Sequence, residues 1–328
     1  MKNIQADIKS GNFKQVYLLY GEEAYLKQQY KQNLVKALNP DGDTMNFNHY
    51  EGKGIDVKQL IDLCETMPFF AERRVVLLED TGFFKNKCEE LADYMKELPD
   101  YLYLVFAETE VDKRNRMYKA VKACGSIAEF IRQDEKTLMR WAAGILGKAG
   151  KKITQRDMEL LLTKTGTDMG NLRMEMEKLI SYTEGRDVVT AEDIEEICTT
   201  QTTNRIFDMV RAVTEKNQKR ALELYYDLLT LKEPPMRILF LLAKQYRQLL
   251  LAKQFAAVGL AQTEIGSKLG VPGFVVKNIT TCARAYTISE LEQAVKDFVD
   301  AEESVKTGRL EDKLSVELLI IKYSSKVK

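Results

Sequence analysis

Short apolar runs alternate with helical patterns through the first part of the chain. Each predicted strand has five or six residues, and an apolar run of that length fits a strand buried on both faces of a sheet; the second strand has a weaker pattern. The predicted strands are residues 16–20, 46–50, 74–78, 101–106 and 126–130. Apolar side chains at helical spacing predict the intervening helices, residues 24–38, 57–66, 86–98 and 116–124. Strands separated by helices indicate βαβ units, and therefore a parallel sheet between helical layers.

Strand patterns stop near residue 136, and helix signals continue from there. A small helical domain is predicted over residues 138–203, where two helix starts pair a Thr with an Asp three residues later. This spacing resembles a capping box with Asp in the place of Glu. The polar stretch 201–204 is interpreted as a linker, and a separate all-helical domain is predicted over residues 204–328. The chain is thus expected to contain three domains, of which residues 1–137 form the α/β domain.

A proline and two large aromatic residues interrupt the pattern just before the third strand. Pro68 cannot continue the preceding helix, so the chain is expected to turn there. A turn is normally exposed, and Met67, Phe69 and Phe70 would then form a compact apolar knob on the surface. Such a knob, held between a helix and a strand, is typical of an anchor for another protein. In the alternative interpretation both Phe rings fold back into the core.

Composition narrows the classes of function. The chain has 328 residues, of which 45% are apolar and 30% charged, as in soluble globular proteins. No apolar run is long enough to span a bilayer and the first residues lack a signal-peptide pattern, so we expect a cytoplasmic protein with no membrane partner. The five Cys are far apart and there is one His, His49. These residues argue against a disulfide framework, a zinc site and His-based catalysis.

The turn after the first strand is where a sheet of this kind would bind a nucleotide. It contains one glycine, Gly21, and lacks the Lys and Ser/Thr of a phosphate-binding loop. Glu22 and Glu23 instead place carboxylates at the N-terminus of the next helix, where they would repel a phosphate. Residues 75–80 resemble the apolar-then-acidic strand end that holds magnesium in nucleotide hydrolases. Because no phosphate-binding loop accompanies it, we interpret this strand end as structural and expect no cofactor, metal or catalytic site.

Basic residues cluster in the third predicted domain. Residues 236–287 contain seven Lys and Arg and one acid, whereas residues 288–303 contain six acids and one Lys. A basic block of this kind is usually a solvated face, and otherwise a contact with a phosphate backbone. Arg247 and Lys253 are the candidates for a DNA contact.

Four stretches together resemble the delta subunit of the bacterial DNA polymerase III clamp loader. They are residues 16–23, 67–74, 166–179 and 206–210, and their order and spacing fit that family over essentially the whole chain. The resemblance implies an AAA+-like first domain without a phosphate-binding loop, a small helical second domain and a helical collar domain. It also implies that Met67, Phe69 and Phe70 are exposed and insert into a pocket on the ring-shaped sliding clamp.

The resemblance further implies how such a chain would act. It binds the sliding clamp (beta) and opens it, or traps it open, for loading onto primed DNA, without hydrolysing ATP itself. The collar domain joins it to the ATP-binding subunits (gamma/tau and delta-prime), and the basic block faces primer-template DNA. The chain would then be a non-catalytic subunit of the DNA-directed DNA polymerase III holoenzyme. Two alternatives stay open: an ATPase of the same superfamily with an unusual phosphate loop, and an enzyme that uses its α/β domain for a small substrate.

Overall fold

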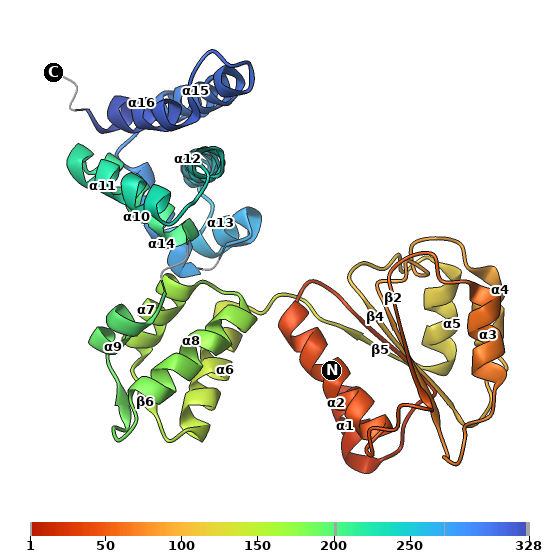
Figure 1. Cartoon of the computed structure of the whole chain (residues 1–328). Helices are drawn as coiled ribbons and strands as arrows, with labels where there is room; N and C mark the ends of the chain where they lie inside the picture. The colour runs from red at the N-terminus through yellow and green to blue at the C-terminus, as the bar shows by residue number, and fades with distance from the viewer. Residues whose placement is uncertain (1, 200–201, 272, 326–328) are drawn as a thin grey trace. The chain divides into compact units, whose positions relative to one another are not determined.

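The chain forms two compact units, residues 1–133 and 134–328, and each is described here by itself. The computed structural model describes residues 2–199, 202–271 and 273–325. The first unit layers helices on both faces of a parallel sheet, and the second is almost entirely helical (Figure 1). The predicted fold class, a parallel α/β domain followed by helices, is therefore confirmed. The boundary predicted at residue 203, within the second unit, stays a prediction.

Five parallel strands form the centre of the first unit, in the order β2-β3-β4-β1-β5. They are β1 (Val16–Tyr20), β2 (Phe47–Glu51), β3 (Arg74–Glu79), β4 (Leu102–Glu108) and β5 (Ser126–Glu129). All five predicted strands are present, with ends that differ from the predicted ones by at most two residues. Val16 of β1 lies opposite Leu104 of β4, and Phe47 of β2 lies opposite Val75 of β3.

Helices cover both faces of this sheet because the strands are apolar on both sides. Tyr17 and Leu19 belong to the core on the face covered by α1 (Lys2–Ser10) and α2 (Ala24–Leu38). The alternate residues of β1 belong to the core on the other face. That face is covered by α3 (Val57–Glu65), α4 (Glu89–Tyr94) and α5 (Arg116–Cys124).

Two features of the first unit differ from the sequence prediction. Helix α1 was not predicted, because only Ile4 and Ile8 of its nine residues are apolar and face the core. Helix α4 is shorter than the predicted 86–98, since it begins at Glu89 and ends at Tyr94.

The second unit contains two apolar cores. The first is enclosed by α6 (Glu135–Lys148), α7 (Gln155–Thr165), α8 (Met169–Tyr182) and α9 (Ala191–Ile197). The capping box predicted at the start of α9 is confirmed, because the Thr190 side chain accepts from the Asp193 amide while the Asp193 carboxylate accepts from the Thr190 amide. A short parallel ladder of β6 (Lys152–Ile153) and β7 (Val188–Val189) was not predicted.

Seven helices surround the other core of the second unit. They are α10 (Thr202–Thr214), α11 (Gln218–Thr230), α12 (Pro235–Ala257), α13 (Gln262–Leu269), α14 (Gly273–Ala283), α15 (Ile288–Lys306) and α16 (Asp312–Ser324). Of the predicted linker, Gln201 lies outside the described residues, and the linker interpretation is wrong for residues 202–204, which begin α10. The sequence pattern also predicts a helix over residues 272–285, whose first residue lies outside the described residues, and it gives no signal for α13. Within residues 2–199, 202–271 and 273–325, no helix is long and apolar enough to cross a membrane.

Candidate functional site

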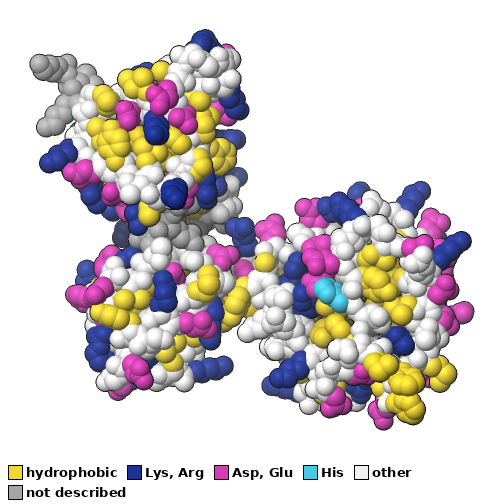
Figure 2. All heavy atoms as spheres, viewed as in Figure 1, with side chains coloured by type: hydrophobic (Ala, Val, Ile, Leu, Met, Phe, Trp, Pro, Cys, Tyr) yellow, Lys and Arg dark blue, Asp and Glu magenta, His cyan; other side chains and the backbone are white. Residues whose placement is uncertain are grey.

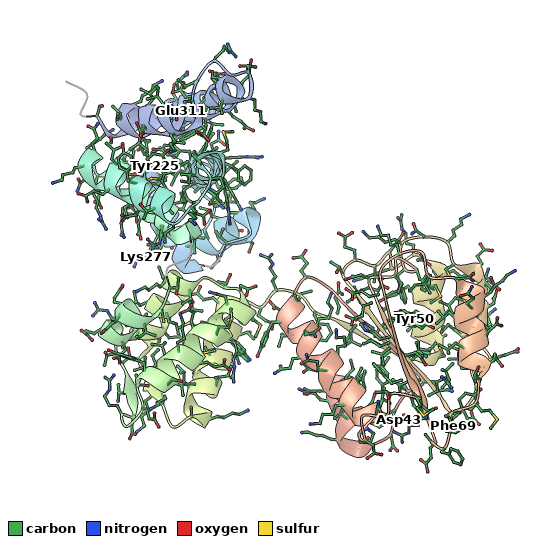
Figure 3. All side chains as sticks on the ribbon, viewed as in Figure 1. Asp43, Tyr50, Phe69, Tyr225, Lys277 and Glu311 are labelled. Atoms are coloured by element: carbon green, nitrogen blue, oxygen red, sulfur yellow. The ribbon has the colours of Figure 1, made fainter. Side chains whose placement is uncertain are left out.

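The loop between α3 and β3 carries the apolar knob, which comprises residues 67–70. Met67, Phe69 and Phe70 are 74%, 57% and 94% exposed, so the interpretation that the two rings fold into the core is wrong. The rings of Phe69 and Phe70 pack edge to face, with centroids 4.5 Å apart. Figure 3 shows Phe69 at the end of the sheet with its ring pointing away from the ribbon, and Figure 2 shows hydrophobic side chains gathered at that edge.

The backbone of the knob is held by two buried polar side chains, although its own side chains are exposed. Asn46 is 3% exposed; its Oδ1 accepts from the Phe69 amide at 2.6 Å, and its Nδ2 donates to the Phe69 carbonyl at 2.8 Å. Arg74 is 5% exposed; its Nε donates to the Thr66 carbonyl at 2.9 Å, and its Nη2 donates to the Met67 carbonyl at 3.3 Å. The knob is therefore fixed through its main chain at both ends.

The pairing of β2 with β3 places Asn46 beside the knob. The Val75 amide donates to the Asn46 carbonyl at 2.9 Å, which sets the residue before β2 next to the residue that begins β3. The Asn46 Nδ2 also donates to the Asp43 carboxylate at 2.5 Å. This hydrogen bond, with one from the Met45 amide, lowers the pKa of Asp43, so the carboxylate is ionised at neutral pH and accepts from both.

One knob residue has an unusual backbone conformation. Phe70 has φ +49°, in the left-handed region, which costs a residue with a side chain on the order of 1 kcal/mol. Such a conformation persists only where the surrounding structure holds it, and the hydrogen bonds of Asn46 act on the residue immediately before. The exposed rings are thus presented by a constrained loop.

The opposite edge of the sheet, where strands end, is where a nucleotide would be expected to bind. The turn after β1 packs against the chain that follows β5: the Glu23 amide donates to the Phe130 carbonyl at 2.9 Å. Gly21 has φ +125°, and a Cβ there would lie 2.3 Å from the same carbonyl oxygen. At least one backbone amide that a phosphate-binding loop would offer is therefore already used within the protein.

Acidic groups at this edge also have partners within the chain. The Glu79 carboxylate lies 2.6 Å from Lys31 Nζ and 3.0 Å from His49 Nε2. Asp80 accepts from both the amide and the hydroxyl of Thr109.

Glu108, at the end of β4, is buried and accepts from the Thr81 hydroxyl at 2.6 Å. Burial raises the pKa of Glu108. In the described part of the chain, no group of three or more His, Cys, Asp or Glu residues is arranged to hold a metal ion.

The two basic residues singled out in the sequence lie apart on α12. They are six positions apart, which separates them by roughly 120° around the helix axis. Arg247 is exposed, but the ammonium of half-buried Lys253 donates to the Ala283 carbonyl at 2.9 Å. Lys244 lies one turn from Arg247 and is exposed on the same side of α12.

A second apolar surface lies on α11 and α16 of the second unit. Leu314, Leu318 and Ile321 recur at helical spacing on the exposed side of α16, opposite its buried residues. Tyr226 of α11 borders this stripe and donates through its hydroxyl to Glu317 at 3.0 Å. Figure 2 shows hydrophobic side chains gathered over these two helices.

Comparison with known proteins identifies the family. A family model described as the DNA polymerase III delta subunit matches residues 17–130, and one described as the C-terminal domain of that subunit matches residues 203–323. The chain belongs to the DNA polymerase III delta subunit family. The first match contains the knob and the sheet edge described above, and the second contains α12 and the stripe on α16.

Individual relatives agree with this assignment. The chain is 26% identical over 332 residues to the DNA polymerase III subunit delta of Bacillus subtilis, covering 97% of this chain and 95% of the relative. It is 22% identical over 276 residues to a protein described as a probable DNA polymerase III subunit delta of Aquifex aeolicus, covering 80% and 77%. The solved structure of the Bacillus subtilis DNA clamp loader delta protein shares the fold, with a TM-score of 0.68, 24% identity and 99% of both chains covered.

The site residues predicted from the sequence do not include the two residues that hold the knob, Asn46 and Arg74. Arg74 carries a signal, because a charged residue that opens an apolar strand must find a partner when it is buried. Asn46 carries none, since its position beside Phe69 depends on the register between two strands that are far apart in sequence.

The exposure of the rings leads to a prediction about stability. We expect the double substitution Phe69→Ala and Phe70→Ala to leave the free energy of unfolding within about 1 kcal/mol of the unsubstituted chain, because exposed rings lose little burial. Phe84, which is completely buried, provides the control: Phe84→Ala should cost roughly 3–5 kcal/mol. Urea unfolding measures both, and a comparable loss in the two variants would mean that the knob rings are part of the core.

Proposed function

We propose that this chain is the subunit of a clamp loader that grips the sliding clamp, and that the knob enters an apolar pocket on the clamp. The observation that carries the proposal is the knob itself, three exposed apolar side chains on a main chain that buried Asn46 and Arg74 hold in place. Protein interfaces derive most of their affinity from a few large anchors of this kind. The name of the Bacillus subtilis structure, a DNA clamp loader delta protein, supports the assignment of the clamp as partner.

We further propose that the chain acts without binding or hydrolysing ATP. Two observations support this: the Glu23 amide is bonded to Phe130, and Glu79 is paired with Lys31 and His49. A nucleotide would have to displace these contacts and approach the carboxylates at the start of α2. Opening then depends on binding alone, through a higher affinity for the open clamp than for the closed clamp.

The second unit would carry the other contacts of the loader. We propose that the stripe of Leu314, Leu318 and Ile321 packs against an ATP-binding subunit, since an exposed apolar helix face of this length is typical of a subunit interface. A contact with primer-template DNA is assigned to Arg247 together with Lys244. Lys253, the other candidate from the sequence, is retained in the proposal only as a comparison, because its ammonium is bonded to the Ala283 carbonyl.

Affinity for the clamp provides the direct test of the knob. Phe69→Ala with Phe70→Ala should weaken binding of the full chain to its sliding clamp on the order of a thousandfold, as expected for two anchor residues of about 2 kcal/mol each. Isothermal titration calorimetry with purified clamp measures the change. Phe240, an exposed Phe on α12, is the matched control, and Phe240→Ala should leave the affinity unchanged. Unchanged affinity in the double variant would disprove the role of the knob.

Nucleotide binding separates the proposal from its alternative, an ATPase with an atypical loop. A fluorescent ATP analogue with magnesium, titrated into the isolated chain, should show no saturable binding up to millimolar concentrations, because the amide of Glu23 already donates to the Phe130 carbonyl. Micromolar binding that is abolished by substitution of Glu22 or Glu23 would favour the ATPase.

The DNA contact is tested by its dependence on salt. In the assembled loader, Arg247→Glu should weaken primer-template binding and reduce the slope of log K against log [salt] by about 1, because one phosphate contact is lost. Lys253→Gln should leave the slope unchanged, since that ammonium is bonded within the chain. Equal slopes for Arg247→Glu and the unsubstituted loader would mean that Arg247 is exposed to solvent in the complex and does not contact DNA.

A further inference from the structure

The side chain of Asn46 connects two loops at the amino-terminal edge of the sheet. Its amide group makes three hydrogen bonds: Oδ1 accepts from the Phe69 amide, and Nδ2 donates to the Phe69 carbonyl and to the Asp43 carboxylate. Both bonds to Phe69 are with its main chain. The side chain thus pairs with the main chain of Phe69 much as a neighbouring strand would, at a point before the chain enters β3.

We propose that Asn46 is the positioning residue of the knob, which holds the main chain of Phe69 in the conformation that the clamp pocket binds. This inference rests on the proposed function, because it concerns the conformation that the knob has before the clamp binds. Asn46 itself is 3% exposed and does not form part of the apolar surface. It acts on binding through the loop, and not through contact with the partner.

The physical need for such a residue follows from the exposure of the knob. Exposed rings gain little from packing on their own protein, so their burial cannot fix the loop. A loop that samples many conformations binds with an affinity reduced by the fraction of time it spends in the competent one. Hydrogen bonds to the main chain of Phe69 restrict the loop without covering the rings. Phe69 is the residue immediately before Phe70, whose backbone has the left-handed conformation.

Arg74 holds the other end of the knob, but it is a poorer probe of positioning. Its guanidinium bonds to the Thr66 and Met67 carbonyls and also to Asn48 Oδ1 in β2, at 3.1 Å. Loss of Arg74 would disturb the pairing of β2 with β3 as well as the knob. The contacts of Asn46 through its side chain are confined to the knob and the preceding loop, so its substitution separates positioning from sheet stability more cleanly.

Binding kinetics distinguish positioning from a general loss of stability. Asn46→Ala in the full chain should lower the association rate with purified sliding clamp by about tenfold, the factor expected if the competent conformation falls to about one-tenth of the population. The dissociation rate should change less than about twofold, because the seated rings make the same contacts.

Asn115 supplies a matched control in the same unit. Its Oδ1 accepts from the Met117 amide at 2.9 Å, and its Nδ2 donates to the Asn86 carbonyl at 2.9 Å and to the Phe83 carbonyl at 3.4 Å. It therefore also makes three hydrogen bonds through its side chain, but none of them is to the knob. Asn115→Ala should leave both rates unchanged at a similar loss of thermal stability. An equal fall in association rate for the two variants, or an effect of Asn46→Ala confined to dissociation, would overturn the inference.

Hydrogen exchange tests the positioning without the clamp. In the unsubstituted chain the Phe69 amide should exchange slowly, although its ring is exposed, and in Asn46→Ala it should exchange at least tenfold faster while Asn115→Ala leaves it protected. If Asn46→Ala fails to fold, rapid exchange of the Phe69 amide in the unsubstituted chain would still refute the inference. Slow exchange together with no clamp binding would refute the proposed function and leave the positioning intact.

Discussion

In a parallel sheet every strand begins at one edge and ends at the other, so loops that enter strands and turns that leave them are kept apart. The first unit uses its two edges differently. At the carboxyl edge, Glu79 is paired with Lys31 and His49, and the turn at Gly21 is packed on Phe130. At the amino edge, the loop that enters β3 projects three apolar side chains into solvent. Groups at the edge where a nucleotide would be expected to bind are thus bonded within the chain, whereas the opposite edge carries the exposed surface.

This division also explains why the knob is held by polar groups. On the proposed function the knob binds a partner, so it cannot be fixed by burial of its own rings, because burial would make the rings inaccessible to that partner. The remaining means are hydrogen bonds to its main chain, and these are strongest where water is excluded. Asn46 and Arg74 meet that condition because the start of β2 and the start of β3 are neighbours in the sheet. The packing of the strands thus determines the stiffness of a loop that makes no strand of its own.

The sequence predicts much of this arrangement, and the failures have physical causes. Four of the strands follow from short apolar runs, the second follows from a weaker pattern, and the knob follows from Pro68 and the two rings after it, because these signals are local. Helix α1 escapes prediction because its apolar pattern consists of Ile4 and Ile8 alone. The charge of Lys253 makes it a candidate for a DNA contact, but its hydrogen bond to Ala283 depends on the packing of α14 against α12. The contact of Asn46 with Phe69 follows from the register between β2 and β3, which no local pattern around Asn46 reveals.

A rigid knob also limits how the proposed function can work. A bound protein shifts the equilibrium between open and closed clamp only by the difference of its affinities for the two. Moving such an equilibrium from 1:99 to 99:1 takes about 5.5 kcal/mol of differential affinity. Two anchor rings supply about 4 kcal/mol of total affinity, and only part of that can differ between the two states. If the hydrogen bonds of Asn46 and Arg74 hold the knob in one conformation, as proposed, the knob does not adapt to the closed clamp and keeps its selectivity. On the proposed function, the knob is therefore better suited to trap a clamp that has opened than to force a closed one apart.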